Sequence, residues 1–412
     1  MAASFTACSS SDDGNGGGGG GGAAGDVSGG GTGAAVVYSA TELKAKIEAT
    51  ANDLMGKINT ADFQEIADLS NYMKYNRINS NDLDNWAQNI VDGLTTYSNN
   101  NVTGLYHASN FHGEFVATNG AWQLVNSNAN HLQFTLAFNG NTYILRLTHS
   151  GNETPLKIHE EDTKWNYSTY QQYKTYKDYT IYIPANLHAS LTKNGQTLAE
   201  ADVNTSFHQG GTNFNPQTDN AQASIKATVG QYVVNVSRAV FNPQSNAELS
   251  VTLSKGSETL ITANAVANGK LNQQEGKMYL QEAGKVNAKV NVLNGRIIVS
   301  GEITNVNELA GYINMASEAK NENEFKNAIN EANNRMNIGI YADNSSESSA
   351  SLKFYSFSEN YYNTTRWHAQ PVIAFKDGSQ YAIAEYFDEK TFSNVIKKFQ
   401  DLMAEFAGLV KK

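Results

Sequence analysis

The pattern that most constrains the fold is an alternation of apolar and polar residues that is interrupted by Asn-Gly pairs. Residues 131–138 and 143–148 alternate in this way, which places every second side chain on one face of a β-strand. An Asn-Gly pair adopts the positive φ angles of a tight hairpin turn at low cost. Such pairs occur at Asn119-Gly120, Asn139-Gly140, Asn194-Gly195 and Asn294-Gly295. The sequence therefore predicts β-hairpins, with an antiparallel meander over residues 105–150.

Two of the expected hairpins resemble each other. Residues 187–203 turn at positions 193–196, and residues 249–266 turn at positions 255–258. The aligned positions are Leu191, Lys193, Thr197, Leu198 and Ala201 in the first, and Leu253, Lys255, Thr259, Leu260 and Ala263 in the second. A third hairpin, joining residues 286–292 to 297–303, matches more loosely. This similarity indicates that a sheet unit was duplicated.

Apolar residues recur at helical spacing in three regions of the chain. Residues 39–95 predict two or three helices, the first opened by a capping box of Ser39 and Glu42. A second helical region follows at 306–329, and strands are expected at 338–341, 351–357, 371–375 and 381–386. The clearest helix spans residues 388–410 and has a broad apolar stripe. We expect this stripe to pack on a sheet, so that truncating Phe399 would cost about 3–5 kcal/mol.

The order of these elements predicts an α+β fold. Its antiparallel curved sheet is built of β-hairpins, with helices at the N-terminus, in the middle and at the C-terminus. The expected divisions are a tail at 1–33, a helical bundle with a β-meander at 34–165, and a hairpin-rich sheet domain at 166–412.

Composition excludes some classes of partner. The chain of 412 residues carries 40 acidic and 30 basic residues, a formal charge of −10. Nucleic-acid phosphates demand a basic surface, so no nucleic-acid partner is expected. No apolar run reaches the length that a membrane-spanning helix needs.

The N-terminal stretch from Phe5 to Asp13 contains Cys8, the single cysteine of the chain. Apolar and small residues precede Cys8, and serines and two aspartates follow it. This arrangement resembles the lipidation box of bacterial lipoproteins, and Ser9–Asp13 resemble the surface-export signal of Bacteroidota lipoproteins. The resemblance implies that Cys8 carries lipid and that the protein is anchored by it at the outer membrane, on the cell surface. An ordinary thiol in a disordered tail is the alternative.

Two further expectations concern this tail. Only seven residues precede Cys8, too few for a signal peptide, so we expect the native start to lie upstream. Residues 14–33 are mostly glycine with small and polar residues, which predicts a flexible tether that folding does not need. The later hairpins, with their Leu-Thr-Lys-Asn-Gly turns and long strands rich in threonine and alanine, also resemble uncharacterised Bacteroidota lipoprotein domains. This resemblance implies no functional residue.

Few residues indicate catalysis. His107 and His112, with Glu114 near, lack the tight spacing of metal ligands. The chain has no Gly-x-Ser-x-Gly motif, and a pair of catalytic carboxylates leaves no fixed spacing in a sequence. No catalytic residue, metal or cofactor is therefore assigned.

Aromatic residues are the stronger indication of binding. Rings stack on the apolar faces of sugars, and neighbouring amides bind hydroxyl groups, so aromatic clusters suit a glycan or peptide. The alternative is that these rings only pack within strands, where tyrosine is common. The candidate ligand-binding residues are Trp165, Tyr167, Tyr170, Tyr173, Tyr361, Tyr362 and Trp367.

Three functions remain open at this point. The first is a non-catalytic surface lipoprotein that binds a glycan, peptide or protein partner or has a structural role. The second is a carrier of lipid or another hydrophobic ligand, with a cavity between sheet and helices. The third is a hydrolase with an unmarked carboxylate pair. The shape of the concave face of the sheet discriminates between them. An apolar cavity on the order of several hundred Å³ favours the carrier, a sealed core favours the binding or structural role, and two facing carboxylates in a cleft favour the hydrolase.

Overall fold

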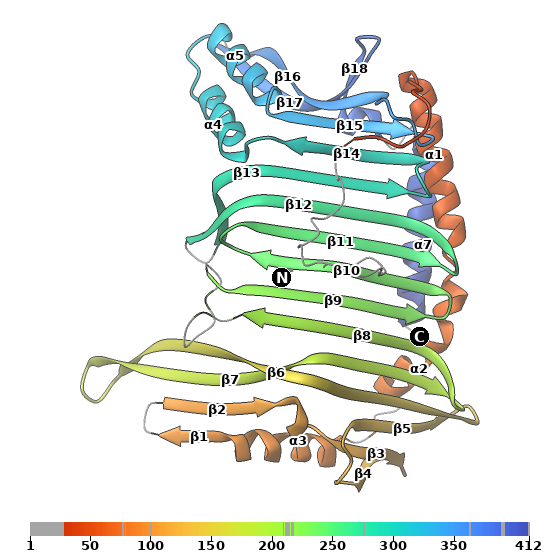
Figure 1. The fold of residues 1–412 in the computed structure, drawn as a ribbon, viewed down its shortest axis with the longest axis vertical. Helices are drawn as coiled ribbons and strands as arrows, with labels where there is room; N and C mark the ends of the chain where they lie inside the picture. Colours follow the sequence, from red (N-terminus) through yellow and green to blue (C-terminus); the bar gives the residue numbers. More distant parts are fainter. Residues whose placement is uncertain are drawn as a thin grey trace, which may run out of the picture. The chain divides into compact units, whose positions relative to one another are not determined.

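The computed structural model describes residues 29–410, except for 76–77, 79, 99–100, 209, 211–214, 216–217, 275–276, 362–363 and 389–391. Cys8 and most of the glycine tract lie outside the described residues, and so does Tyr362. The fold is α+β, with antiparallel sheet nearly throughout and helices near the start, middle and end of the chain, which confirms the predicted class (Figure 1).

The chain forms two compact units. The terminal unit consists of the residues up to Thr60 together with Tyr232–Ala407, and the central unit is Ala61–Gln231 together with the residues from Gly408 onward. These boundaries differ from the expected division at residues 165 and 166. Those two residues pair with Gln172 and Gln171 near the turn of one long hairpin, so this hairpin continues through the expected boundary.

The central unit contains helices α2 and α3 and a nine-stranded sheet. The helices are α2 (Gln64–Tyr75) and α3 (Asn81–Leu94). The strands are β1 (Thr95–Ser98), β2 (Asn101–His107), β3 (Gly113–Thr118), β4 (Ala121–Asn126), β5 (Leu132–Phe138), β6 (Asn141–Asn166), β7 (Gln171–Lys193), β8 (Gln196–His208) and β9 (Asn220–Val229). Their order is β1-β2-β7-β6-β5-β3-β4, with β8 added to β7 and β9 to β8.

Two strand pairs in this sheet are parallel. Strand β2 pairs with β7, and β3 pairs with β5, both in parallel orientation. The expectation of a simple antiparallel meander over 105–150 is therefore wrong, because β2 pairs with β7, about 75 residues later, and not with β3, while β3 pairs with β5 in parallel. The core of this unit consists of Leu69, Phe115, Trp122, Leu136 and Tyr143.

The terminal unit contains a second nine-stranded sheet, in which each strand pairs antiparallel with the next in sequence. Its strands are β10 (Tyr232–Asn242), β11 (Asn246–Lys255), β12 (Glu258–Gln274), β13 (Lys277–Val292), β14 (Ile297–Ile303), β15 (Met336–Ala342), β16 (Ala350–Tyr361), β17 (Thr364–Phe375) and β18 (Gln380–Ala382). Its helices are α1 (Ala40–Lys57), α4 (Val306–Ser317), α5 (Glu322–Asn333), α6 (Ile383–Tyr386) and α7 (Ser393–Val410). The expected strand at 381–386 is thus wrong beyond Ala382, where the chain turns into α6.

Local signals at turns and caps are confirmed. Asn139, Asn194 and Asn294 adopt positive φ angles at hairpin turns. Ser39 and Glu42 form the predicted capping box at the start of α1. The two similar hairpins, β7–β8 and β11–β12, also share their register, with an irregularity directly after the equivalent residues Leu191 and Leu253. The common irregularity supports the inference of duplication.

The end of the glycine tract docks onto the terminal unit, which corrects the expectation of a free tether up to Gly33. The backbone N–H of Gly31 donates to Ser345 O at 2.7 Å, and that of Gly33 donates to Asn344 O at 2.8 Å. A Cβ atom on Gly31 would lie 2.1 Å from Asn344 O. Glycine is required here because the two backbones approach too closely for a side chain.

Helix α7 corrects another expectation. Phe399 lies on the predicted apolar stripe but is 55% exposed, and Met403, one turn later, is exposed as well. Val395, Ile396, Leu402 and Phe406 are half-buried. The apolar face of helix α7 is therefore wider than the surface that covers it. The aromatic anchor is Phe392, which is buried just before the helix begins, with its ring 5.2 Å from that of Phe387.

Candidate functional site

The central sheet has one apolar and one polar face over strands β6 to β9. Paired residues lie on the same face, so the strand register assigns each row to a face. Three rows, each crossing β6, β7, β8 and β9, form the apolar face, and His149 is the polar residue among them. The rows are Leu145, Leu191, Ala199 and Val229; Leu147, Ala189, Ala201 and Ala227; and His149, Leu187, Val203 and Ile225.

The rows between them belong to the opposite face and are polar. They are Arg146, Ser190, Glu200 and Thr228, and then Thr148, His188, Asp202 and Lys226. His188 and Asp202 bond to each other across the strands at 2.7 Å. The contrast between the faces is that of a sheet with one solvated side and one side meant for burial.

Part of the apolar face is uncovered. We call this part the apolar stripe and define it by Leu147, Leu187 and Ile225, which are 40%, 38% and 36% exposed. Side chains of this size on the apolar face of a sheet are normally buried against a helix or a second sheet. An exposed apolar surface of this kind indicates a binding surface.

An apolar pocket of about 230 Å³ borders the stripe, and α2 forms one of its walls. Leu145 and Leu191 belong both to the pocket and to the apolar face. The other lining residues are Ile66, Leu69, Ser70, Met73, Trp122, Phe134, Leu136 and Tyr143. An apolar cavity of roughly 150 Å³ is enough to hold a benzene ring. The pocket therefore has room for one ring or for a section of an alkyl chain.

The polar group of Tyr143 is already engaged. Its hydroxyl donates to Glu65 Oε1 at 2.6 Å, and Lys193 also pairs with Glu65. Burial, together with this hydrogen bond, raises the pKa of Tyr143 to about 12. The hydrogen bonds from Lys193 and Tyr143 hold the pKa of Glu65 below its ordinary value. Among the lining residues, the other side-chain hydrogen-bonding groups are the Ser70 hydroxyl and the Trp122 indole N–H.

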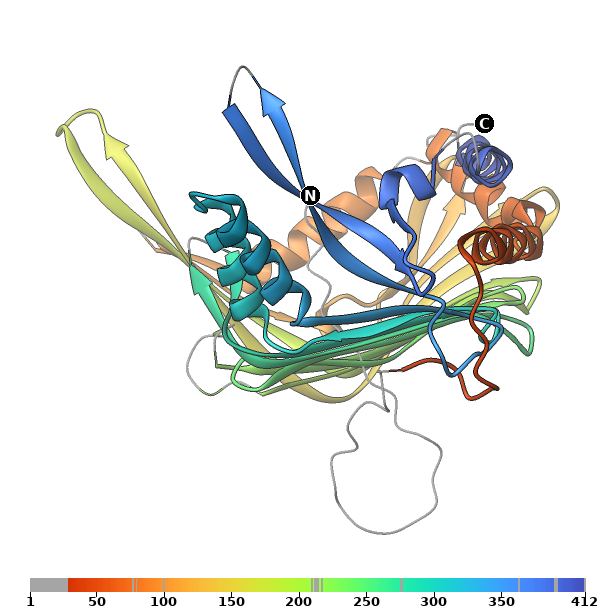
Figure 2. The same ribbon diagram turned by 90° about the horizontal axis from the view of Figure 1, so that it is seen from above.

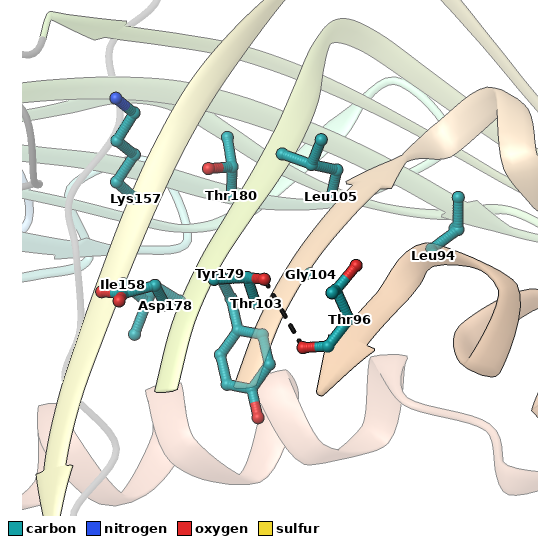
Figure 3. Close-up of a pocket in the computed structure, with 10 residues that line it drawn as sticks. All are labelled: Leu94, Thr96, Thr103, Gly104, Leu105, Lys157, Ile158, Asp178, Tyr179 and Thr180. Carbon is teal, nitrogen blue, oxygen red and sulfur yellow. Dashed lines mark hydrogen bonds between the residues drawn. The ribbon is translucent and has the colours of Figure 1, made fainter. Parts of the chain in front are cut away.

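A second, larger hollow of about 390 Å³ lies at the base of the long hairpin and is lined by residues of β1, β2, β6 and β7 and by Leu94 at the end of α3 (Figure 3). Lys157, Thr180 and Leu105 lie side by side here, one from each of three neighbouring strands, and Tyr179 projects to the opposite side. Thr103 donates to Thr96 O at 3.5 Å. This hollow mixes aliphatic, hydroxyl and charged groups on an open surface, so it offers less apolar enclosure than the pocket beside α2.

Four of the predicted aromatic residues lie together at the tip of the β6–β7 hairpin, which extends beyond the other strands of its sheet (Figures 1 and 2). They are Trp165, Tyr167, Tyr170 and Tyr173, and all four are exposed. Trp367 is different, because it packs with Phe354 against the buried cluster of Ala316, Phe325, Ala328 and Ile329. Its ring thus contributes to packing and lies apart from the four rings of the hairpin tip. Tyr361 ends β16, and its side chain lies outside the described residues.

The histidines do not converge on a metal site within the described part of the chain, where no group of three potential ligands gathers. His107 bonds to Glu153 at 2.5 Å and stacks on Tyr182, while His112 donates to Ser109 O at 2.8 Å. Glu114 instead approaches His131 at 3.3 Å. Contacts with neighbouring residues of the fold thus account for these side chains.

The comparisons identify no relatives: no protein-family model, curated protein or solved structure matches this chain. Among the described helices, none has both the length and the apolar character needed to cross a membrane.

Sequence analysis did not identify the apolar stripe of the central sheet, although the pattern that indicates it was present. Alternation in β7 and β8 identifies the face, but whether anything covers that face depends on helices elsewhere in the chain.

Proposed function

We propose that the protein is a lipid-anchored binding protein of the cell surface whose central unit holds a hydrophobic ligand without catalysing a reaction. The observation that carries the proposal is the continuity between the apolar pocket and the exposed apolar stripe. Leu145 and Leu191 line the pocket, and the next row on the same face begins with the exposed Leu147. A ligand that fills the pocket can continue along the sheet without meeting a charged group in that row.

The chemistry of the surface supports a chain-like apolar ligand over a sugar. Sugars need several hydrogen-bonding groups, whereas the Tyr143 hydroxyl is engaged by Glu65. The row from Leu132 on β5 to Ala227 on β9 crosses five adjacent strands. At a strand spacing of about 4.8 Å, this row is about 19 Å long, enough for an extended alkyl chain. Anchoring through Cys8 belongs to the same proposal and rests on the sequence resemblance.

Binding of a fluorescent apolar probe tests the proposal. The full chain is titrated with N-phenyl-1-naphthylamine, which brightens in apolar sites, and a long-chain fatty acid is then added as competitor. We expect saturable binding and displacement. The double variant Leu187→Gln/Ile225→Gln removes apolar contact from residues that are already exposed and should raise the probe Kd by about tenfold. Ser70 is exposed on α2 and lines the pocket, so the larger side chain of the variant Ser70→Trp should obstruct the pocket and also weaken probe binding.

The matched control is Lys226→Gln. Lys226 neighbours Ile225 in β9 and is exposed, but it lies on the polar face. The control variant should bind the probe as tightly as the parent chain does. Absence of saturable probe binding, or equal affinity in the double variant and the control, would refute the proposal.

A further inference from the structure

The tip of the β6–β7 hairpin is a free two-stranded arm. Strand β2 pairs with β7 only from Tyr176 to Tyr182, so the strand positions from Asp162 to Thr175 pair only with each other. We call the segment Thr163–Lys174 the arm tip. A two-stranded ribbon without a hydrophobic face to pack on gains little stability by itself. The sequence nevertheless places large rings there.

The composition of the arm tip differs from that of the whole chain. Its 12 residues include Trp165, Tyr167, Tyr170 and Tyr173, two lysines and no acidic residue, while the chain as a whole has a charge of −10. Tyr167 and Tyr170 are 79% and 75% exposed. The acidic residues nearest to the tip lie closer to the base of the arm, at Glu160, Glu161 and Asp162. Lys174 pairs with Glu161 at 2.5 Å. The outermost part of the arm is therefore aromatic and basic.

The turn at the tip is held in a defined conformation. Asn166 Oδ1 accepts hydrogen bonds from the backbone N–H groups of Ser168 and Thr169, at 2.9 and 3.3 Å. Tyr170 has a φ of +53°, in the left-handed region that bulky residues avoid. Glycine or asparagine would occupy this position at lower cost. A strained, solvent-exposed tyrosine at this position indicates that its ring has a use outside the fold.

The rings do not form a flat platform. The register pairs Trp165 with Gln172 on one face of the ribbon, and Lys164 with Tyr173 on the other. Tyr167 and Tyr170 occupy the turn between the strands. A glycan stacks on rings that share a plane, whereas these rings surround a projecting tip. A lipid bilayer can enclose such a tip from all sides.

We propose that the arm tip enters the interfacial layer of a lipid bilayer. Tryptophan and tyrosine favour the headgroup level of membranes, where their apolar rings are buried and their polar atoms stay hydrated. Lys164 lies on the same tip, and its ammonium group can reach anionic headgroups, whereas the ammonium group of Lys174 is paired with Glu161. The tip thus offers a membrane contact separate from any N-terminal lipid and independent of the ligand proposed for the central unit.

Vesicle partitioning of the full, unacylated chain tests this proposal. The probes are vesicles of phosphatidylcholine alone and of phosphatidylcholine with phosphatidylglycerol, and binding is measured by co-sedimentation. Brominated lipids report insertion by quenching tryptophan fluorescence. We expect binding to both vesicles, stronger binding with phosphatidylglycerol, and quenching of Trp165. The variant Trp165→Ser/Tyr167→Ser/Tyr170→Ser should lower the partition coefficient at least about tenfold.

The control variant is Tyr97→Ser. Tyr97 on edge strand β1 is 71% exposed, comparable to the tip tyrosines, but lies outside the arm tip. This variant should partition like the parent chain. Failure of the parent chain to bind either vesicle would overturn the proposal, as would an equal loss in both variants. Glycan binding that the triple variant loses, in a chain that ignores vesicles, would assign the tip to carbohydrate instead.

Discussion

Ser345 offers a sharp test of the docked N-terminal segment. It is fully buried, and its hydroxyl connects two stretches of chain. The Oγ atom accepts from the backbone N–H of Val36 at 2.9 Å and from that of Glu347 at 3.0 Å. As a donor, the same hydroxyl has two alternative acceptors, the carbonyl oxygens of Val36 and Glu347, which lie 2.8 and 2.9 Å from Oγ. Ser345→Ala therefore removes the acceptor of two backbone donors at once.

The expected loss follows from those two donors. Both hydrogen bonds are partly buried and each contributes about 1 kcal/mol, so Ser345→Ala should lower the free energy of unfolding by about 2 kcal/mol. Urea unfolding followed by circular dichroism measures this loss. Hydrogen exchange locates it, because the Val36 amide should exchange on the order of 30-fold faster.

The neighbouring Ser346 is the matched control. It has the same chemistry but is exposed, so Ser346→Ala should change stability by no more than about 0.5 kcal/mol. Equal, small effects of the two substitutions would refute the claim that residues 29–38 are docked through Ser345.

Two further outcomes are expected. Phe399→Ala should change the free energy of unfolding by less than about 1 kcal/mol, whereas Phe392→Ala, at a buried ring, should cost about 3–5 kcal/mol in the same urea titration; a large loss at Phe399 would restore the packing of the whole α7 stripe. Metabolic labelling with a fatty acid in the native host should mark the full-length precursor and not its Cys8→Ala variant, and equal labelling of both would end the anchoring hypothesis.

The sequence predicted those features that depend on neighbouring residues. Asn194-Gly195 determines the β7–β8 turn, and the alternation on either side of it determines which side chains share a face. Ser39 and Glu42 define the start of α1 in the same way. Each of these signals acts within a few residues, so chain topology does not alter it.

Features that depend on distant residues were not predictable in this way. The parallel pairing of Leu105 with Thr180 requires β2 to find a strand far along the chain, and no local pattern encodes that choice. Gly30 and Gly31 have the composition of a linker, but they are glycines because Tyr341 and Asn344 approach them closely. Trp165 and Trp367 both occur in aromatic stretches. One is on a free arm, and the other is packed against α5.

The exposed aliphatic residues Leu187 and Ile225 of the central sheet support the proposed ligand by a further argument. Leu191 and Leu187 lie on the same face of β7, yet Leu191 lines the pocket beside α2 and Leu187 is exposed. Threonine forms strands as well as leucine does, and the polar face of the same sheet uses Thr148 and Thr228. A large aliphatic residue at an open position of a sheet adds a risk of aggregation that threonine would avoid. The presence of Leu187 and Ile225 at these open positions is explained if an apolar ligand covers them.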